Sequence, residues 1–189
     1  MKTATCLLFW LALAHIGISA EQYTLDAGHS ELGFQVRHFA SSVIGKFTEF
    51  SGMVIFNPAQ PERSSVEATI QVQSIDTGIK DRDHHLLSAE FFDAQKFPTI
   101  TFKSTSIDRT SERTADVHGN LTMHGTTRPV LLHVELLPEK NDASDSLRWK
   151  ITTSLKRKSF GLGWNALIEA SQAVGDDISI RMKMVTTAH

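Results

Sequence analysis

Regular alternation of apolar and polar side chains is the feature that most limits how this chain can fold. Val66 to Gln73 alternates without a break, and Leu32 to His38 does the same. Because successive side chains of a strand point to opposite faces, such segments form strands with one buried and one exposed face. Further strands are expected at Phe50 to Phe56, Thr99 to Ile107, Ala115 to Met123, Arg128 to Leu137, Leu147 to Leu155 and Ile178 to Val185. The pattern therefore predicts an all-β protein of about eight antiparallel strands.

Turn residues separate these strands and indicate short connections. His124-Gly125 stands between two of them and predicts a tight hairpin in which the glycine adopts positive φ. Short connections without helical crossovers favour an up-and-down barrel or a sandwich. No linker, composition shift or internal repeat divides the chain, so a single domain is expected. The interior of an eight-stranded barrel is just wide enough to be filled by side chains or to hold one slender ligand.

The first residues of the chain have the pattern of a secretory signal peptide. Lys2 precedes an apolar run at residues 6–14, and small residues follow at Ser19-Ala20. A retained membrane anchor is disfavoured because this run is short for a membrane span and His15 interrupts it. Removal of residues 1–20 is therefore expected to leave a domain at residues 21–189 with no stable membrane span.

Composition argues against several classes of function. Cys6 is the only cysteine and lies in the predicted signal peptide, so the mature chain would have no internal disulfide and no thiolate metal site. The formal net charge is −2, and no dense stripe of Lys and Arg suggests contact with nucleic acid. Stability is expected to come from an apolar core, which a domain of this length can build.

The segment Ser74 to Phe102 contains the one predicted helix. Helical spacing is seen at His85, Leu86, Ala89 and Phe92. Charged residues at positions 81–85 stand beside Phe91, Phe92 and Phe97. A short helix with one polar and one apolar face is therefore predicted between two strands, where it would act as a lid.

Histidines are frequent but do not form a metal-binding pattern. His38 shares the predicted inward face of its strand with Phe34 and Val36. A buried imidazole needs a hydrogen-bond partner, so His38 is either a satisfied core residue or a ligand contact. His84 and His85 diverge by about 100° on a helix, and no HExxH spacing occurs. No metal site is predicted.

Catalytic residues are also not evident. Ser30, Ser41 and Ser42 are the candidate nucleophiles, but none lies in a GxSxG element or another catalytic frame. The predicted inward faces carry mainly Leu, Val, Ile and Phe. We therefore predict no catalytic residue.

The chain is rich in phenylalanine and has a single tyrosine, Tyr23. Its Phe residues include Phe34, Phe47, Phe50, Phe56, Phe91, Phe92, Phe97, Phe102 and Phe160. Such a set fills a core or lines a tunnel for a long hydrocarbon. Composition does not separate a packed barrel from a hollow one.

A series of motifs extends along the mature chain. It comprises Asp26-Ala27-Gly28-His29-Ser30, Gly45-Lys46-Phe47, Ser74-Ile75-Asp76-Thr77, Arg82-Asp83-His84-His85-Leu86, Phe91-Phe92-Asp93, Phe97 to Phe102 and Gly119-Asn120-Leu121-Thr122. Together these motifs resemble those of the YceI-like family. The resemblance implies a lipocalin-like, eight-stranded antiparallel up-and-down barrel with a short helix between two strands, exported to the periplasm.

The resemblance also implies a function. Members of the family hold a polyisoprenoid or similar amphiphile, so this chain is expected to carry or store an isoprenoid quinone, a polyprenyl phosphate or a fatty amide. No cofactor is expected apart from such a lipid, and a homodimer is left open. The expected ligand-binding residues are Phe34, Val36, His38, Phe47, Phe50, Arg82, His85, Leu86, Phe91, Phe92, Phe102 and Phe160. Among these, Arg82 and His85 are expected at the polar rim.

One element departs from the family pattern. Ser159 in Arg157-Lys158-Ser159-Phe160-Gly161 stands where an acid is usual, which puts any role of that acid in doubt.

Two alternatives to a lipid-binding function are kept. The first is an envelope enzyme acting on a lipid-like substrate, with His38 or His85 as acid or base. The second is a solid-cored interaction scaffold.

Overall fold

The computed structural model describes residues 20–138, 146–163 and 174–188. Apart from residue 20, the predicted signal peptide at residues 1–20 lies outside the described residues.

Eleven strands of the described residues form one sheet. They are β1 (Glu21–Leu25), β2 (Glu31–His38), β3 (Ser41–Phe47), β4 (Phe50–Phe56), β5 (Ser65–Gln71), β6 (Ile75–Asp76), β7 (Thr99–Arg109), β8 (Thr114–Met123), β9 (Thr126–Leu136), β10 (Ser146–Lys156) and β11 (Val174–Ala188). The other described elements are the helix α1 (Lys80–Leu87) and the 3-10 turns η1 (Ala27–His29), η2 (Pro61–Arg63), η3 (Val72–Ser74) and η4 (Arg157–Phe160).

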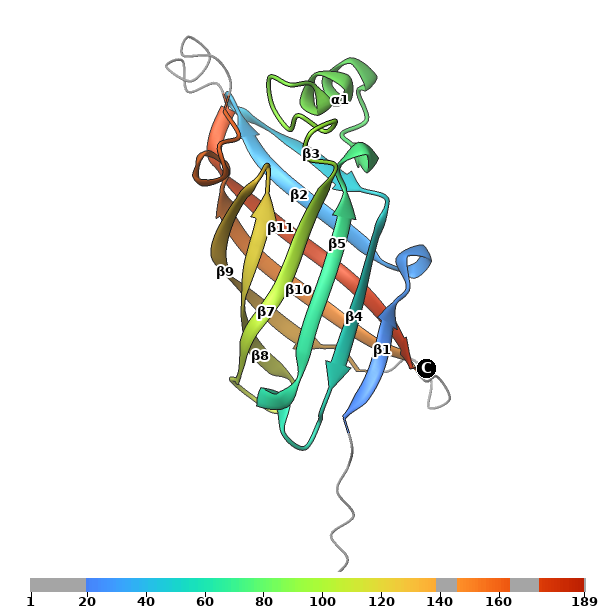
Figure 1. Cartoon of the computed structure of the whole chain (residues 1–189). Coiled ribbons are helices and arrows are strands. Elements are labelled where there is room, and N and C mark those ends of the chain that lie inside the picture. The colour runs from blue at the N-terminus through green and yellow to red at the C-terminus, as the bar shows by residue number, and fades with distance from the viewer. Residues whose placement is uncertain (1–19, 139–145, 164–173, 189) are drawn as a thin grey trace, which may run out of the picture.

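The sheet closes on itself into a barrel (Figure 1). Neighbouring strands follow the order β4-β5-β7-β8-β9-β10-β11, and β1 pairs with both β4 and β11. The long strand β11 pairs with β2 over its first part and with β1 near its end, so β1 and β2 occupy the same position in the wall. In the same way β4 pairs with β1 and β3 pairs with β2, so β3 and β4 share the next position. The wall therefore has eight positions, and every pairing is antiparallel. The predicted eight-stranded up-and-down barrel is confirmed.

The predicted strand Val66 to Gln73 is too long. The strand β5 ends at Gln71, and the next three residues form η3. Ser74 Oγ donates to Gln71 O at 2.7 Å, and Val72 N donates to Pro98 O at 2.9 Å. These bonds turn the chain out of the ladder although Val72 continues the alternation.

The predicted hairpin at His124-Gly125 is confirmed. Met123 of β8 pairs with Thr126 of β9, so the loop has two residues. Both adopt positive φ, 50° at His124 and 69° at Gly125. This is the type I′ geometry, whose twist matches that of the flanking strands.

The helix α1 lies over one end of the barrel, between β6 and β7 in the chain (Figure 1). It ends before the aromatic residues that were expected on its apolar face, and none of its side chains is buried. Phe91 and Phe92 are buried and follow in a turn where Asp93 adopts a φ of 48°. Ser88 ends the helix, and Phe92 N donates to Leu86 O at 3.0 Å. The expected lid differs in detail: the helix is mostly polar and contributes only Leu86 and Leu87 to the core, and the turn after it supplies the aromatic residues of the apolar side.

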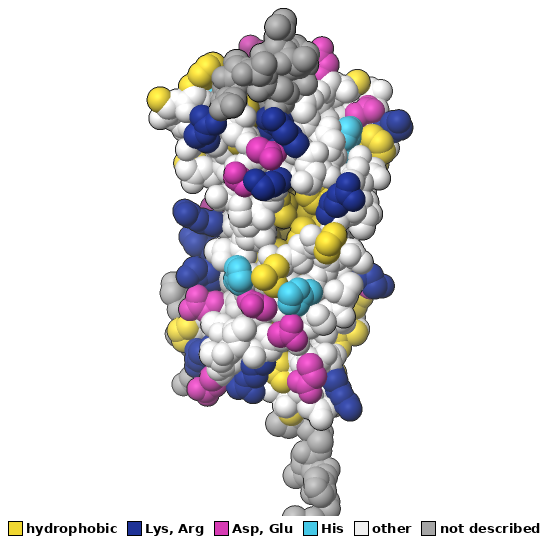
Figure 2. Space-filling view, turned by 90° about the vertical axis from the view of Figure 1, so that its left-hand side faces the viewer, with side chains coloured by type: hydrophobic (Ala, Val, Ile, Leu, Met, Phe, Trp, Pro, Cys, Tyr) yellow, Lys and Arg dark blue, Asp and Glu magenta, His cyan; other side chains and the backbone are white. Residues whose placement is uncertain are grey.

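The outer surface of the barrel carries charges of both signs. Figure 2 shows Lys, Arg, Asp and Glu side chains interspersed over one side of the molecule. Lys103 pairs with Glu67 at 2.7 Å, and Lys156 pairs with Asp177 at 3.1 Å. The hydrogen bonds in these pairs raise the pKa of both lysines above the usual value. In the ranges that the structure covers, no α-helix combines the length and apolar character needed to cross a bilayer.

Candidate functional site

The barrel interior contains a cavity of about 700 Å³. All eight positions of the wall contribute inward-facing side chains to it, and most of these are apolar. Cavities of about 300–1,000 Å³ are typical of sites for small molecules and cofactors. The barrel is therefore hollow, a point that its phenylalanine content left open.

Eleven of the twelve predicted ligand-binding residues line this cavity. Phe34, Val36 and His38 reach it from β2, as their alternation predicts. The other lining residues of the set are Phe47, Phe50, Arg82, His85, Leu86, Phe91, Phe92 and Phe102. Their contact with a ligand stays a prediction.

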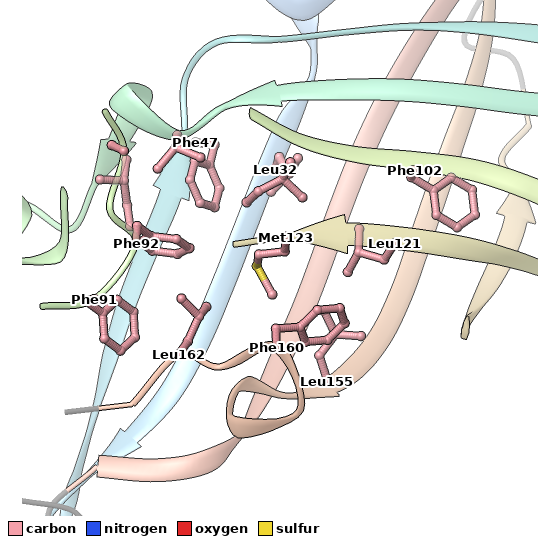
Figure 3. Close-up of a cluster of buried hydrophobic side chains, with 14 of the residues drawn as sticks. Leu32, Phe47, Phe91, Phe92, Phe102, Leu121, Met123, Leu155, Phe160 and Leu162 are labelled. Carbon is pink, nitrogen blue, oxygen red and sulfur yellow. The ribbon is translucent and has the colours of Figure 1, made fainter. Parts of the chain in front are cut away.

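Phe160 is the predicted residue that does not line the cavity. It lies in η4, where the alternation of the strands no longer applies, and it is only 2% exposed within the hydrophobic core. Figure 3 shows its ring at this turn. Leu155 before the turn and Leu162 after it line the cavity instead.

Aromatic side chains line the end of the cavity opposite α1. Phe56 and Trp149 line this end, with their rings in a T-shaped contact at 5.3 Å between centroids. Tyr23 contacts Phe56 edge-on at 6.4 Å. Trp149 Nε1 donates to Thr186 Oγ1 at 3.0 Å, so the indole N–H has a partner. This end is suited to an apolar tail.

A polar network forms the rim at the α1 end. Arg82 Nε donates to Thr77 Oγ1 at 2.7 Å, and Arg82 Nη2 donates to Thr77 O at 2.8 Å. Thr77 in turn donates to Asp83 Oδ1 from its hydroxyl and, at 3.0 Å, from its backbone N. His85 Nε2 lies 2.9 Å from Glu90 Oε2. The bonds to Thr77 hold α1 to the chain that follows β6, and the His85 contact joins α1 to the turn after it. Arg82 and His85 both line the cavity at this rim.

An aromatic layer lies on the inner side of this rim. Phe91 and Phe92 meet edge to face at 5.1 Å, and Phe92 contacts Phe47 at 6.3 Å. Phe47 is 5.7 Å from Phe34. Figure 3 shows Phe47 and Phe92 pointing toward one another, with Leu162 on the same side of the interior. The layer joins the turn after α1 to the wall of the cavity.

Two inward-facing glycines make room for phenylalanine rings. A Cβ on Gly45 would lie 2.4 Å from Phe34 Cζ, and one on Gly119 would lie 2.3 Å from Phe102 Cζ. Both distances are far below van der Waals contact. The rings can therefore lie against the wall only because these residues have no side chain.

Arg157 is a site residue that the sequence reasoning missed. It lines the cavity although it is only 2% exposed. Its Nε donates to Gly175 O at 2.9 Å, Nη1 to Leu162 O at 2.7 Å and Nη2 to Val174 O at 3.2 Å. The guanidinium thus joins Leu162, just after η4, to Val174 and Gly175 at the start of β11.

The structure shows what the candidate nucleophiles contact. Within residues 20–138, 146–163 and 174–188, no three His, Cys, Asp or Glu side chains are arranged to hold a metal ion. Ser30, a candidate nucleophile, donates to Asp26 O at 2.6 Å and accepts from Val185 N at 2.9 Å. Ser41 donates to His38 O at 3.0 Å. The Ser30 hydroxyl therefore joins the turn after β1 to β11, and the Ser41 hydroxyl bonds within the turn between β2 and β3.

Comparison with known proteins identifies the barrel. The sequence profile of the YceI-like domain matches residues 23–186, which is nearly all of the wall. The chain belongs to the YceI-like family. A UPF0312 protein of Ectopseudomonas mendocina is 37% identical over 148 residues, which cover 76% of this chain and 78% of that protein. A UPF0312 protein of Azotobacter vinelandii is 35% identical over 185 residues, 95% of this chain and 96% of that protein.

Solved structures share the YceI-like barrel. BcnA of Burkholderia cenocepacia superposes with a TM-score of 0.78 at 25% identity, covering 85% of this chain and 98% of that chain. A polyisoprenoid binding domain from Saccharophagus degradans, implicated in plant cell wall breakdown, gives a TM-score of 0.65 at 19% identity, over 88% and 98% of the two chains. The second likeness is one of fold alone.

Proposed function

We propose that the protein binds a polyisoprenoid or similar long-chain amphiphile inside the barrel, for transport or storage. The observation that carries the proposal is the apolar cavity of about 700 Å³, with a polar rim at α1 and aromatic side chains at the opposite end. Each buried methylene of a tail contributes up to about 0.8 kcal/mol before ordering costs are subtracted. The polyisoprenoid-binding description of the Saccharophagus domain, which has the same fold, supports this class of ligand.

The tail is proposed to extend toward Trp149, and the head group to stay near Arg82 and His85. This orientation follows from polarity, because the rim offers hydrogen-bond donors and the opposite end is aromatic. The signal-peptide pattern at residues 1–20 supports export, and we place the protein in the periplasm. N-terminal sequencing of protein isolated from that compartment tests the export step.

A binding protein accounts for the site better than an enzyme does. The hydroxyls of Ser30 and Ser41 are engaged in hydrogen bonds to backbone groups, and a hollow interior argues against a solid-cored scaffold. Incubation with a polyprenyl lipid should return the lipid unchanged. Product formation that is lost in His38→Ala, with lipid still bound, would instead support the enzyme.

Native mass spectrometry tests the proposal most directly. Gently purified protein should carry a bound amphiphile or take up an added polyprenyl lipid. Ala68→Trp places a ring in the cavity from β5 and should abolish uptake, whereas Met53→Trp adds the same ring at a position that is 41% exposed and should not. A homogeneous unliganded mass with no uptake would contradict the proposal.

A further inference from the structure

One boundary between neighbouring strands of the wall is paired over only part of its length. β9 and β10 form four residue pairs, the last of them His133–Thr152, whereas β10 and β11 form eleven and β8 and β9 form ten. Both strands continue beyond His133–Thr152, over residues 126–132 of β9 and 153–156 of β10, and all of these residues are described. This part of the boundary, the β9–β10 seam, therefore lacks strand pairing.

A side chain crosses the seam in place of the ladder. Thr153 Oγ1 donates to Leu131 O at 2.7 Å. Backbone N–H groups are the donors in an antiparallel ladder, so a hydroxyl in this place indicates that the two backbones have separated. Farther along β9, Arg128 Nε donates to Ser159 O at 3.2 Å, which joins this strand to η4. The seam is thus bounded by the last strand pair at one end and by the Arg128 bond at the other.

The inner side of the seam is apolar. Val130 and Leu132 of β9 line the cavity, and so does Leu155 of β10. Leu131 lies between two inward-facing residues and therefore points outward, yet it is partly buried. Figure 2 shows the side of the molecule on which β9 lies, where apolar side chains sit in a recess between charged ones. The apolar interior therefore comes close to the surface along the seam.

Both ends of the cavity, by contrast, contain packed aromatic rings. At the α1 end, Phe92 is buried and contacts Phe47 and Phe91 edge to face. At the opposite end, Phe56 and Trp149 are in T-shaped contact. A ligand that passed either end would have to separate these rings, and one that crossed the β8–β9 or β10–β11 boundary would have to break a ladder. The seam has no ladder to break.

We propose that the hydrocarbon tail of the bound amphiphile enters and leaves the cavity sideways, through the β9–β10 seam. This inference rests on the proposed function and adds a route of exchange to it. An alkyl or prenyl chain fits the route because the inner side of the seam is apolar. At about 3.3 Å per residue, the four residues of β10 in the seam span about 13 Å. Since the Thr153 hydroxyl bridges the two strands, breaking its bond to Leu131 widens the route.

A cross-link over the seam tests the route. Residues 21–189 contain no cysteine, so introduced thiols react alone. Leu131→Cys and Ser154→Cys place two outward side chains opposite one another when the register of His133–Thr152 is continued. A short bis-maleimide joins them without forcing the strands together. Uptake of a fluorescent polyprenyl lipid from vesicles, and its release to them, should both slow at least about tenfold because the barrier to passage rises.

The control is the same cross-link at a paired boundary. Thr69→Cys and Thr101→Cys lie opposite one another between β5 and β7. Both side chains point outward, because the residues on either side of each line the cavity. This cross-link should change neither the uptake rate nor the release rate.

Two threonine substitutions test the bridging bond itself. Thr153→Val removes the bond to Leu131 and keeps the shape of the side chain. It should speed release about twofold to tenfold, the effect of one hydrogen bond on a barrier. Thr122→Val removes the bond between the hydroxyls of Thr122 and Thr127, which lie 2.8 Å apart across the paired β8–β9 boundary. Release from this variant should be unchanged.

Each other outcome has a defined meaning. Unchanged rates in the cross-linked seam, with the link confirmed by mass, would overturn the lateral route and leave lipid binding intact. Weaker equilibrium binding with an unchanged uptake rate would make the seam a wall of the site and would overturn the route as well. Failure of the unmodified protein to take up lipid would overturn the proposed function itself. Hydrogen exchange tests the seam without lipid: residues 153–156 should exchange faster than residues 149–152 of the same strand, and equal rates would contradict an unpaired seam.

Discussion

Substituting Gly119 by alanine should push the ring of Phe102 into the cavity. The added Cβ would lie 2.3 Å from Phe102 Cζ and 2.4 Å from Cε2. It would also lie 2.7 Å from the carbonyl oxygen of Lys103, which belongs to the wall and moves less easily than a ring. Since Phe102 already lines the cavity, the interior is the open direction for its ring.

The cost of this change follows from overpacking. Forcing an extra carbon into a packed site costs about 1–3 kcal/mol. For a domain of about 150–250 residues, each kcal/mol lowers the melting temperature by about 2–4 °C, so Gly119→Ala should lower it by about 2–12 °C. The displaced ring also shortens the space for a tail. Each methylene that is excluded should weaken binding about fourfold.

Thermal unfolding by circular dichroism, with and without polyprenyl lipid, measures both effects. Gly33→Ala is the control, because its Cβ would lie 3.5 Å from Arg181 O, an ordinary contact. Its melting temperature should stay level or rise, since alanine is favoured over glycine inside a strand. Adding Phe102→Leu to Gly119→Ala should recover part of the loss, with a coupling of about 0.5–3 kcal/mol. Strict additivity, or an unchanged melting temperature in Gly119→Ala, would refute the reasoning.

Two further changes probe the aromatic end of the cavity and the hairpin. Trp149→Phe removes the hydrogen bond to Thr186, which is 1% exposed, and should cost about 1–3 kcal/mol in urea unfolding. Adding Thr186→Val should recover part of that cost, and no recovery would mean that the loss comes from packing. Gly125→Ala combines a φ of +69° with a Cβ at 2.6 Å from Phe97, so it should lower the melting temperature more than Gly78→Ala, where φ is +78° but no atom lies within 4 Å. Equal losses of melting temperature in the two variants would show that the backbone strain at positive φ, and not the contact with Phe97, accounts for the destabilisation.

Strands with clean alternation could be predicted from the sequence, and strands without it could not. Val66 to Gln71 and Leu32 to His38 alternate because one face meets the interior and the other meets water. The strand β3 was missed because Ser41, Ser42 and Gly45 interrupt the apolar pattern. The short strands β1 and β6 offer too few residues for a period to be seen.

Residues of the cavity wall could likewise be predicted where they lie on strands with clean alternation. Alternation predicted the positions of Phe34, Val36 and His38 on the cavity wall. It could not place Phe160, because a 3-10 turn follows no two-residue period. Arg157 was missed because it stands between Lys156 and Lys158, and residue type does not reveal which of three adjacent cations is buried.

Whether an eight-stranded barrel is hollow depends on the volume of its inward side chains. In this chain several inward positions are small, namely Ala68 on β5, Ala115 on β8, and the glycines at positions 45 and 119. Gly45 lies directly opposite Phe34 in the β2–β3 register, and Gly119 lies two pairs along from Phe102 between β7 and β8. Each ring therefore rests on the backbone of the neighbouring strand instead of crossing the interior. The number of phenylalanines carries no information about this arrangement. The informative quantity is the pairing of each large residue with a small one across a strand boundary, and it becomes visible only when the register is known.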